Sequence, residues 1–451
     1  MSKQQISVIG AGYAGLCTAI GFASKGYKVF AVDLDPKKVT LINEGISPFY
    51  EIGLETLLQK ALEQGKLKCT TNYKEAILES DITFITVGTP GKRDGSINLT
   101  QVEKAARETG EVLKEKGAYH LVVVKSTVVP GTTENIVKPI IEKFSGKDCG
   151  DEFGICTNPE FLREGSGIHD TLHPDRIIIG EIDKKAGDML ESLYRDFYGN
   201  EMPPLIRTNI PTAELIKYAN NAFLATKISF INEIANICEK IPGADVTVVA
   251  KGIGLDKRIG PRFLQAGLGY GGSCLPKDVK ALIAYSKKLG CKPTLLKAVN
   301  KINETQPYKA VELCRKALGN LKDKRIAILG LAFKPNTDDI RNAVSIKIIR
   351  KLLKEEASII VYDPVAMPNV KKKFKDSIKY ASSSLDCIKN ADCCILVTEW
   401  DEFKTLKPED FVQNMKQPIL IDGRRIYNQE LFNRKLRFMA VGIGQTYNKP
   451  K

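Results

Sequence analysis

The sequence predicts an α/β protein with two Rossmann-like, doubly wound parallel-sheet domains joined by a long central helix. Three observations predict this fold: a strand, a glycine turn and a helix near the start, a long central stretch without Gly or Pro, and a C-terminal third that repeats the strand pattern of the first. A chain of 451 residues has room for about two to four domains. We expect an N-terminal domain over 1–205, a central helical domain over 206–312 and a C-terminal domain over 313–451.

The N-terminal part alternates strands and helices. Ile6–Ile9 is a short apolar strand, followed by a glycine-rich turn, a helix to about Lys25 and a second strand over Val29–Val32 that ends at Asp33. This is a strand–helix–strand unit of about 30 residues. Further strands are predicted over Ile82–Val87, Leu121–Val124 and Ile177–Ile179, with helical segments between them. The alternation predicts a mostly parallel sheet covered by helices.

The central part begins with a stretch, Pro211–Ile241, that has no internal Gly or Pro. As one helix it would be about 45 Å long. Its apolar residues lie on several sides: Leu215, Ile216, Phe223, Leu224, Ile228, Ile231 and Ile234. Such a helix is buried or packs against another subunit, so we expect a homodimer or a higher homo-oligomer. A glycine-rich segment over 252–276 follows, then helices near Val279–Leu289 and Lys297–Leu318.

The C-terminal third repeats the strand pattern of the first. Three segments correspond in the same order: Arg325–Gly330 to Gln5–Gly10, Ile359–Pro364 to Phe30–Pro36, and Ala391–Thr398 to Ser80–Val87. The second copy has Gly330-Leu331-Ala332-Phe333-Lys334, which lacks the full glycine pattern. We therefore expect it to bind something other than a dinucleotide.

The first glycine turn, Gly10-Ala11-Gly12-Tyr13-Ala14-Gly15, has the spacing of a dinucleotide site. Gly10 permits the tight turn, Gly12 lets a pyrophosphate approach the backbone, and Gly15 lets the helix pack on the strand. The N-terminus of the helix then faces the phosphates. Asp33 at the next strand end would accept hydrogen bonds from the ribose hydroxyls, which favours NAD over NADP. The alternative is a tight turn that binds no ligand. Because Lys37 and Lys38 lie close to Asp33 in the sequence, NADP stays possible as the cofactor.

Cys274 stands in the most informative segment, Gly267–Asp278. Four glycines within six residues let the backbone approach a bulky ligand, and Pro276 suits the first turn of a helix. A cysteine just before a helix N-terminus has a raised thiolate fraction. Such a thiolate allows a four-electron oxidation with two NAD+, through a thiohemiacetal and a thioester. The alternatives are a structural cysteine with Asp278 matching the helix dipole, and a simple two-electron hydroxyacid dehydrogenase.

The composition of the chain bears on whether the protein binds a metal, a nucleic acid or a membrane. Of the eleven cysteines, ten are expected to be buried apolar residues. His169 and His173 have helical spacing but lack the glutamate of a zinc motif, so no metal is expected. The net charge of +14 suits a polyanionic ligand, but the charges are spread out, so we expect no nucleic-acid partner. The sequence has neither an apolar run of membrane-spanning length nor a signal-peptide layout at Met1–Gln5, which predicts a cytoplasmic protein without a membrane partner.

Taken together, these motifs resemble the UDP-glucose/GDP-mannose dehydrogenase family along essentially the whole chain. The matching motifs are Gly10–Gly15, Val87-Gly88-Thr89-Pro90, Lys125–Thr132, Asn158–Gly165, Gly271–Asp278 and Phe333-Lys334. The resemblance implies an N-terminal domain that binds NAD, a central dimerisation domain and a C-terminal domain that binds a nucleotide sugar. Four segments are most like the members that oxidise UDP-glucose at C6: Ser47–Glu51, Pro174–Ile177, Asp256–Gly260 and Ile421–Arg425. GDP-mannose and a UDP-N-acetylhexosamine stay as alternative substrates.

The resemblance also implies the roles of single residues. Cys274 would be the nucleophile, and Lys217 and Asn221 would stabilise the oxyanions of the tetrahedral intermediates. The residues around the catalytic water and general base would be Thr127, Glu160, Glu164 and Asp278. Cofactor contacts would come from Gly10, Gly12, Tyr13, Ala14, Gly15, Asp33, Lys38, Thr89, Thr127, Glu164, Lys277 and Arg341.

The substrate contacts implied by the resemblance come from all three domains. They are Glu160, Phe161, Leu162, Lys217, Asn221, Arg258, Phe263, Tyr270, Gly271, Phe333, Lys334 and Arg424. Arg258 would reach into the site of the neighbouring subunit, which would make the dimer functional. Arg424 and its neighbour Arg425 are both candidates for one contact. Gln265 departs from family members that have Lys there, so that contact to the nucleotide is uncertain.

Overall fold

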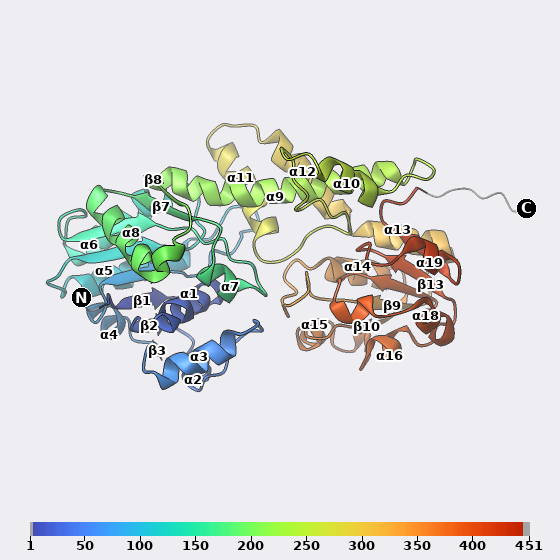
Figure 1. Cartoon of the computed structure of the whole chain (residues 1–451), viewed down its shortest axis with the longest axis horizontal. Coiled ribbons are helices and arrows are strands. Elements are labelled where there is room, and N and C mark those ends of the chain that lie inside the picture. Colours follow the sequence, from blue (N-terminus) through green and yellow to red (C-terminus); the bar gives the residue numbers. More distant parts are fainter. Residues whose placement is uncertain (1–2, 445–451) are drawn as a thin grey trace, which may run out of the picture. The chain divides into compact units, whose positions relative to one another are not determined.

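The computed structural model describes residues 3–444. The chain forms two compact units, Met1–Asn220 and Asn221–Lys451, and the boundary falls within the long helix α9 (Ile210–Cys238). Each unit contains a predominantly parallel sheet, which confirms the predicted α/β fold class (Figure 1). The division into three domains at the predicted boundaries stays a prediction.

The first unit is built on an eight-stranded sheet in the order β3-β2-β1-β4-β5-β6-β7-β8. The strands are β1 (Ile6–Ile9), β2 (Val29–Val32), β3 (Leu67–Thr70), β4 (Ile82–Ile85), β5 (His120–Val124), β6 (Phe153–Thr157), β7 (Ile177–Glu181) and β8 (Leu205–Asn209). Neighbouring strands are parallel except β6 and β7. Strands β1, β4 and β5 are buried along their whole length, because helices cover both faces.

Two helical layers cover this sheet. The helices are α1 (Tyr13–Ser24), α2 (Pro36–Asn43), α3 (Leu54–Glu63), α4 (Tyr73–Leu78), α5 (Thr100–Leu113), α6 (Lys138–Ser145), α7 (Gly167–Leu172) and α8 (Lys184–Tyr198), with short turns at Thr133–Val137 and Gly199–Glu201. Helix α1 packs against α3 and α7, and α5 packs against α4 and α6. The expected glycine turn between β1 and α1 is therefore held between a buried strand and a buried helix.

Helix α9 has 29 residues, so it is about 44 Å long. The prediction of one long helix over Pro211–Ile241 is confirmed, although the helix ends three residues earlier, at Cys238. Its apolar residues do lie on several sides, since Ile231 is fully buried whereas Phe223 is 66% exposed.

The second unit begins with helices α10 (Val246–Gly254), α11 (Leu275–Lys288), α12 (Thr294–Thr305) and α13 (Tyr308–Leu318). Helix α11 starts directly after Cys274, as the position of Pro276 predicts. The prediction of one helix over Lys297–Leu318 is wrong, because α12 ends at Thr305 and α13 begins at Tyr308. Pro307 lies between them, and because it has no N–H to donate, the hydrogen bonding of one continuous helix is interrupted there.

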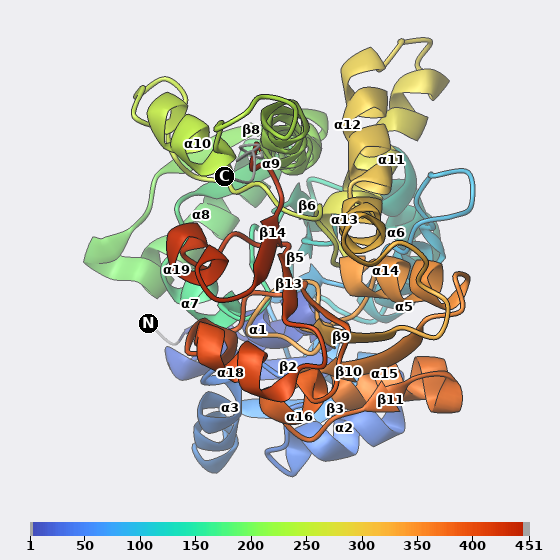
Figure 2. The ribbon, with the colours of Figure 1, turned by 90° about the vertical axis from the view of Figure 1, so that its right-hand side faces the viewer.

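A six-stranded sheet in the order β11-β10-β9-β12-β13-β14 forms the rest of the second unit. Its strands are β9 (Arg325–Leu329), β10 (Ser358–Tyr362), β11 (Lys379–Tyr380), β12 (Cys393–Leu396), β13 (Ile419–Asp422) and β14 (Arg437–Ala440). Its helices are α14 (Val344–Leu353), α15 (Met367–Phe374), α16 (Ser384–Ile388), α17 (Asp401–Lys404), α18 (Pro408–Asn414) and α19 (Gln429–Asn433), with a short turn at Lys375–Ser377. Helices α13 and α14 lie on one face, and α16 and α18 on the other (Figure 2).

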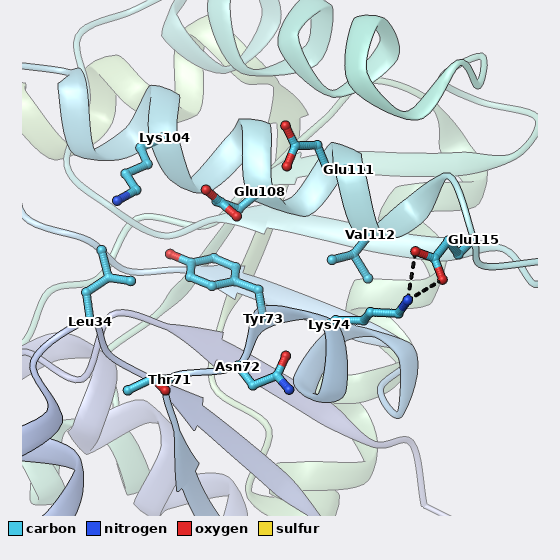
Figure 3. Close-up of a pocket in the computed structure, with 10 residues that line it drawn as sticks. All are labelled: Leu34, Thr71, Asn72, Tyr73, Lys74, Lys104, Glu108, Glu111, Val112 and Glu115. Atoms are coloured by element: carbon cyan, nitrogen blue, oxygen red, sulfur yellow. Dashed lines mark hydrogen bonds and ion pairs between the residues drawn. The ribbon is translucent and has the colours of Figure 1, made fainter.

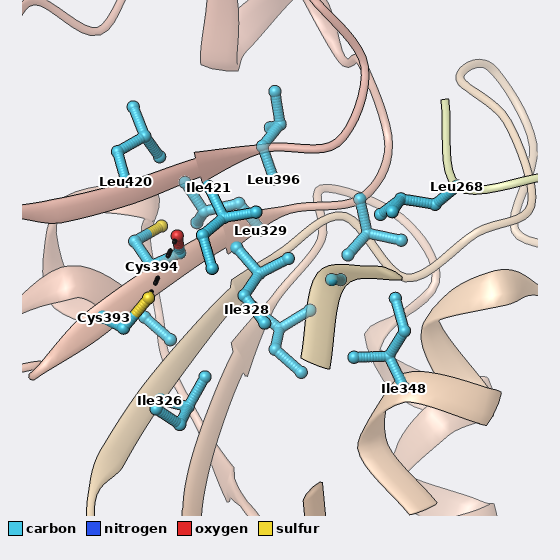
Figure 4. Close-up of a cluster of buried hydrophobic side chains, with 14 of the residues drawn as sticks. Leu268, Ile326, Ile328, Leu329, Ile348, Cys393, Cys394, Leu396, Leu420 and Ile421 are labelled. Carbon is cyan, nitrogen blue, oxygen red and sulfur yellow. Dashed lines mark hydrogen bonds between the residues drawn. The ribbon is translucent and has the colours of Figure 1, made fainter. Parts of the chain in front are cut away.

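The core of this sheet explains most of the cysteines. Cys393 and Cys394 are fully buried among strand residues such as Ile328 and Leu420 (Figure 4). Eight of the eleven cysteines are buried. The expectation of ten is wrong, because Cys149 is half-buried and Cys291 is exposed at the end of α11. All eleven are free thiols.

The two sheets repeat one arrangement, as the matched segments predict. Strand β9 lies between β10 and β12 just as β1 lies between β2 and β4, with parallel pairing throughout. Among residues 3–444, no helix combines the length and hydropathy that crossing a membrane requires.

Candidate active site

The predicted groups of the first unit gather at one edge of its sheet. Strands β1, β4, β5 and β6 are parallel and adjacent, so their carboxyl ends meet at the same edge. The glycine turn follows β1, Thr89 follows β4, Thr127 follows β5, and Glu160 follows β6. This edge of an open α/β sheet is where such folds bind ligands.

The three glycines of the turn have three different environments. Gly10 has a φ of 101°, a conformation that residues with a side chain rarely adopt. A methyl group added at Gly15 would overlap the carbonyl oxygen of Gly10 and crowd Thr86. A methyl group added at Gly12 would meet only open space. Because Tyr13 and Ala14 form the first turn of α1, their amides face this space, and the turn fits a pyrophosphate.

Asp33 is held at the end of β2. Its carboxylate accepts hydrogen bonds from the Ala11 and Asp35 amides (3.0 and 3.1 Å) and forms an ion pair with Lys38 (2.7 Å). The side chain of Asp33 stays 13% exposed, so it can still accept a ribose hydroxyl. Of the two lysines that left binding of NADP open, Lys38 is therefore paired with Asp33.

A pocket of about 410 Å³ lies next to Asp33, between the ends of β2 and β3 and one face of α5 (Figure 3). Leu34, Tyr73, Lys104 and Glu108 are among its lining residues. Burial, together with the carboxylates of Glu108 and Asp33, raises the pKa of Tyr73 to about 12, so its hydroxyl stays protonated at neutral pH. The pocket therefore offers an apolar wall, a ring and hydrogen-bonding groups beside the predicted ribose site.

Thr89 and Thr127 lie together at the predicted cofactor edge. The Thr89 hydroxyl donates to the Thr127 carbonyl oxygen (2.8 Å), and Thr89 is buried. Glu214, in the first turns of α9, holds the loop that follows Thr127. Its carboxylate accepts hydrogen bonds from the Gly131 and Thr133 amides (2.6 and 2.9 Å). Burial raises the pKa of Glu214 to about 7.

Glu160 and Lys217, both predicted as catalytic, form an ion pair (3.2 Å). Lys217 is only 4% exposed, so it is not the surface lysine that a long amphipathic helix would explain. The second carboxylate oxygen of Glu160 accepts a hydrogen bond from the Leu162 amide (2.6 Å), and both residues lie on the loop after β6. Phe161 lies on the same loop, with the Lys217 ammonium 5.2 Å from its ring centre.

Two basic residues at this edge were missed in the sequence analysis. Lys125 donates to the side-chain oxygen of Asn158 (2.7 Å), and burial lowers its pKa to about 8. The Arg176 guanidinium stacks 3.8 Å from the ring centre of Phe161 and donates to Asn220 (2.8 Å). Both belong to motifs quoted above, but only the fold shows what they contact.

In the second unit, Cys274 is the exposed N-cap residue of α11. Its sulfur lies 3.5 Å from the hydroxyl of Ser273. One turn into the helix, Asp278 is 1% exposed and accepts hydrogen bonds from Asn221 (2.7 Å) and Lys277 (2.6 Å). Predicted residues from two distant segments, Asn221 on α9 and Lys277 and Asp278 on α11, are thus brought together near the start of α11, and Asn221 is buried.

The glycine loop before Cys274 is packed closely on its surroundings. A side chain at Gly271 would crowd Asn342 and Phe333, and one at Gly272 would crowd the Phe333 ring. Tyr270 is buried, and its backbone is held by the side chain of Asn303 through two hydrogen bonds (2.8 and 3.0 Å).

The two arginines of Asp422–Arg425 have different surroundings. Arg425 donates to both carboxylate oxygens of Asp245 (2.9 and 2.8 Å) and has a side chain only 9% exposed. Arg424 lies beside the glycine loop, with Nη1 3.3 Å from the Gly269 carbonyl oxygen.

The remaining predicted residues are spread over loops. Lys334 lies beside Phe333, with its ammonium 5.8 Å from the ring centre. Arg341 pairs with Asp339 (2.8 Å), and Phe263 has a positive φ of 66°. Arg258 pairs with Asp256 (2.6 Å), and its side chain is 88% exposed. Glu164 is half-buried on the loop after β6. Within residues 3–444, no group of three or more His, Cys, Asp or Glu residues is arranged to hold a metal ion.

The first unit contains a glycine turn of the dinucleotide-binding kind, and the second contains an exposed cysteine at the N-terminus of a helix; both features were predicted for a nucleotide-dependent oxidoreductase. Family models match nearly all of the chain: the NAD binding domain over 4–198, the central domain over 211–305 and the UDP binding domain over 327–429. The chain belongs to the UDP-glucose/GDP-mannose dehydrogenase family, and it is an NAD-dependent dehydrogenase.

Individual relatives match over almost their full length. The chain is 46% identical to UDP-glucose 6-dehydrogenase AglM of Haloferax volcanii (94% of this chain, 97% of that protein). It is 43% identical to UDP-glucose 6-dehydrogenase YwqF of Bacillus subtilis (97% of each). A UDP-glucose dehydrogenase structure from Pyrobaculum islandicum is 39% identical and superposes with a TM-score of 0.91, covering 98% of each chain.

Substitutions at Gly12 and Gly15 distinguish a glycine that makes room for the ligand from a glycine that lets the helix pack on the strand. With Gly12→Ala we expect an unchanged melting temperature but a Kd for NAD raised at least about tenfold, because the methyl group occupies only ligand space. With Gly15→Ala we expect weaker binding of NAD and also a free energy of unfolding lowered by about 1–3 kcal/mol, because the methyl group overlaps the Gly10 carbonyl. Thermal denaturation and NAD titration measure both effects. Equal destabilisation by the two substitutions would contradict the assignment.

Proposed function

We propose that the enzyme oxidises the C6 alcohol of UDP-glucose to the carboxylate, with two NAD+ reduced per sugar. The observation that carries the proposal is the exposed Cys274 at the start of α11, next to Asp278 with its partners Asn221 and Lys277. The substrate is inferred from relatives that are 43–46% identical and are named UDP-glucose 6-dehydrogenase.

For the cofactor, the environment of each group supports a role. The open space at Gly12 and the first turn of α1 would receive the pyrophosphate, and Asp33 the adenosine ribose. The pocket with Leu34 and Tyr73 would take the adenine base. Bound NAD+ accepts a hydride in each oxidation. Thr89, Thr127, Glu164, Lys277 and Arg341 are the further cofactor contacts that we propose.

In the first oxidation, C6 loses a hydride and its hydroxyl loses a proton, which gives an aldehyde. The Cys274 thiolate then adds to this carbon, and the resulting oxyanion takes up a proton to give a thiohemiacetal. Lys217 and Asn221 would face the developing negative charge; both are buried, where a fixed charge or dipole has a large effect.

In the second oxidation, the thiohemiacetal carbon loses a hydride and its hydroxyl a proton, which leaves a thioester on Cys274. Water then adds to the thioester carbon, the thiolate leaves, and the product is the carboxylate. Thr127, Glu160, Glu164 and Asp278 would orient this water and accept its proton. Free thiols throughout the chain fit a cytoplasmic location, which we include in the proposal.

For the nucleotide sugar, the surroundings of the two arginines favour Arg424. Each arginine has a carboxylate partner, Asp245 for Arg425 and Glu399 for Arg424 (3.2 Å), but Arg424 lies beside Gly269 in the glycine loop. The further contacts that we propose are Glu160, Phe161, Leu162, Lys217, Asn221, Arg258, Phe263, Tyr270, Gly271, Phe333 and Lys334. The close packing of Phe333 on Gly271 and Gly272 supports a shared surface for the ligand.

We further infer a homodimer formed along α9 and α10. Phe223, Phe230 and Ile237 recur every seven residues on α9 and are 66%, 49% and 50% exposed. Val248 on α10 and Leu255 directly after α10 have the same spacing and are 67% and 76% exposed. Rows of large apolar side chains at this spacing are typical of helix–helix interfaces. Arg258, 88% exposed shortly after α10, would reach the site of the second subunit.

The reaction is tested by counting NADH per sugar with UDP-glucose, GDP-mannose and UDP-N-acetylmannosamine as separate substrates. We expect two NADH per UDP-glucose and at least about a hundredfold lower kcat/KM with the other two. One NADH per sugar would support the two-electron alternative, and a preference for another sugar would replace the substrate assignment.

Cys274→Ser tests the covalent steps. Because a serine hydroxyl is a much weaker nucleophile than a thiolate, acid formation should fall at least about a hundredfold, either with the reaction stalled after the first oxidation or with turnover lost. Cys291→Ser is the matched control, since Cys291 is the other exposed cysteine at an end of α11. Normal two-NADH turnover by Cys274→Ser would refute the assigned role.

The combined variant Phe223→Glu/Phe230→Glu tests the dimer. Two carboxylates in an apolar interface should raise the dimer dissociation constant at least about a hundredfold, and activity should fall as Arg258 is withdrawn from the second subunit. Sedimentation and activity are measured at the same protein concentrations. Leu289→Glu, at another exposed apolar position, should change neither the dimer dissociation constant nor the activity. A wild-type monomer, or a fully active monomeric variant, would contradict the proposal.

A further inference from the structure

Glu51 lies between α2 and α3, is 7% exposed and is absent from the predicted site. One of its carboxylate oxygens accepts hydrogen bonds from the Tyr13 hydroxyl (2.6 Å) and the Gly165 amide (2.7 Å). The other oxygen accepts the Gly167 amide (2.7 Å). This carboxylate therefore joins two segments that are far apart in the sequence, one at Tyr13 and one at Gly165 and Gly167.

Tyr13 strengthens the same connection. Its hydroxyl oxygen lies 2.9 Å from the Arg163 carbonyl oxygen and accepts the Gly167 amide at 3.0 Å. A side chain at Gly167 would overlap the Tyr13 ring, so the loop after β6 packs directly on this tyrosine. Burial and the neighbouring Glu51 raise the pKa of Tyr13, so its hydroxyl stays a donor.

The segments that Glu51 joins both belong to the candidate active site. Tyr13 is the first residue of α1, at the turn that fits the pyrophosphate. The loop carries Glu160 and Glu164 just before the glycines that Glu51 holds. Fixing Gly165 and Gly167 to Tyr13 therefore fixes the position of these two carboxylates relative to the cofactor turn.

A carboxylate suits this position better than an amide. Its contacts named above are an O–H and two N–H donors, and an ionised carboxylate only accepts hydrogen bonds. Glutamine would turn its own N–H groups toward one of these donors. Losing a buried hydrogen bond to a charged group lowers affinity or rate by about tenfold to a hundredfold.

We propose that Glu51 is a positioning residue that ties the Glu160–Gly167 loop to Tyr13 and so holds Glu160 and Glu164 in place for the reaction. The kinetic consequence rests on the proposed function. The link between the segments does not, so the two can fail separately.

The test compares Glu51→Gln with Glu63→Gln, a matched change at an exposed position on α3. Hydrogen exchange of peptides covering Gly165 and Gly167 reports the link without any substrate. We expect exchange at least about tenfold faster in Glu51→Gln, and a kcat with UDP-glucose lowered about tenfold to a hundredfold. The Kd for NAD should change less than about threefold, since the glycine turn itself is intact. Glu63→Gln should match the wild type in every measurement.

Tyr13→Phe and the double variant complete the experiment. If the carboxylate and the hydroxyl act as one unit, the double variant should lose no more kcat than Glu51→Gln alone. Wild-type exchange in Glu51→Gln would overturn the proposal, as would an activity loss matched by an equal loss of NAD binding and melting temperature. If Glu51→Gln does not fold, Tyr13→Phe decides alone: faster exchange at Gly167 with lowered kcat supports the proposal, and unchanged exchange overturns it. A wild type that leaves UDP-glucose unoxidised would refute the proposed function, while exchange would still decide the link.

Discussion

The parallel alignment of β1, β4, β5 and β6 is the constraint on which the first unit depends. Parallel neighbours end at one edge of a sheet, so the loops after these strands have to meet there. Residues as distant as Gly12, Thr89, Thr127 and Glu160 become neighbours for this reason alone. The register is fixed by strands that are buried on both faces, where a slip by one residue would move each side chain to the opposite face.

The second sheet shows how the same arrangement serves a different purpose. Asp363 corresponds to Asp33, but it is fully enclosed and accepts hydrogen bonds from the amides of Leu331, Ala332, Val365 and Ala366 and from the Trp400 ring. A carboxylate with all these donors has no capacity left for a ribose. The repeat thus preserves the turn and strand pairing, but Asp363 is an internal link, whereas Asp33 stays partly exposed and is the residue proposed to bind the ribose.

Local patterns in the sequence predict what depends on neighbouring residues. The roles of Gly10, Gly12 and Gly15 follow from backbone geometry, and the start of α11 follows from Pro276. Contacts between distant segments could not be predicted in this way. Nothing local to Glu51 or Arg176 shows that one meets Tyr13 and the other Phe161. The break between α12 and α13 is different, because Pro307 is a local signal in the sequence at which a helix is often interrupted.

One face of helix α9 has three buried polar residues that the stability of the fold alone does not explain. Glu214, Lys217 and Asn221 are spaced three and four residues apart, so they share one face, and each is at most 5% exposed. A polar group left unsatisfied there would cost about 1–3 kcal/mol. Each instead has a partner: loop amides for Glu214, Glu160 for Lys217 and Asp278 for Asn221. Well-packed apolar residues would often be at least as stable as such pairs, so stability alone does not account for this face. The roles proposed for Lys217 and Asn221 would account for two of these groups, because a charge and a hydrogen-bond donor held rigidly in a buried site can meet a developing negative charge without first reorganising.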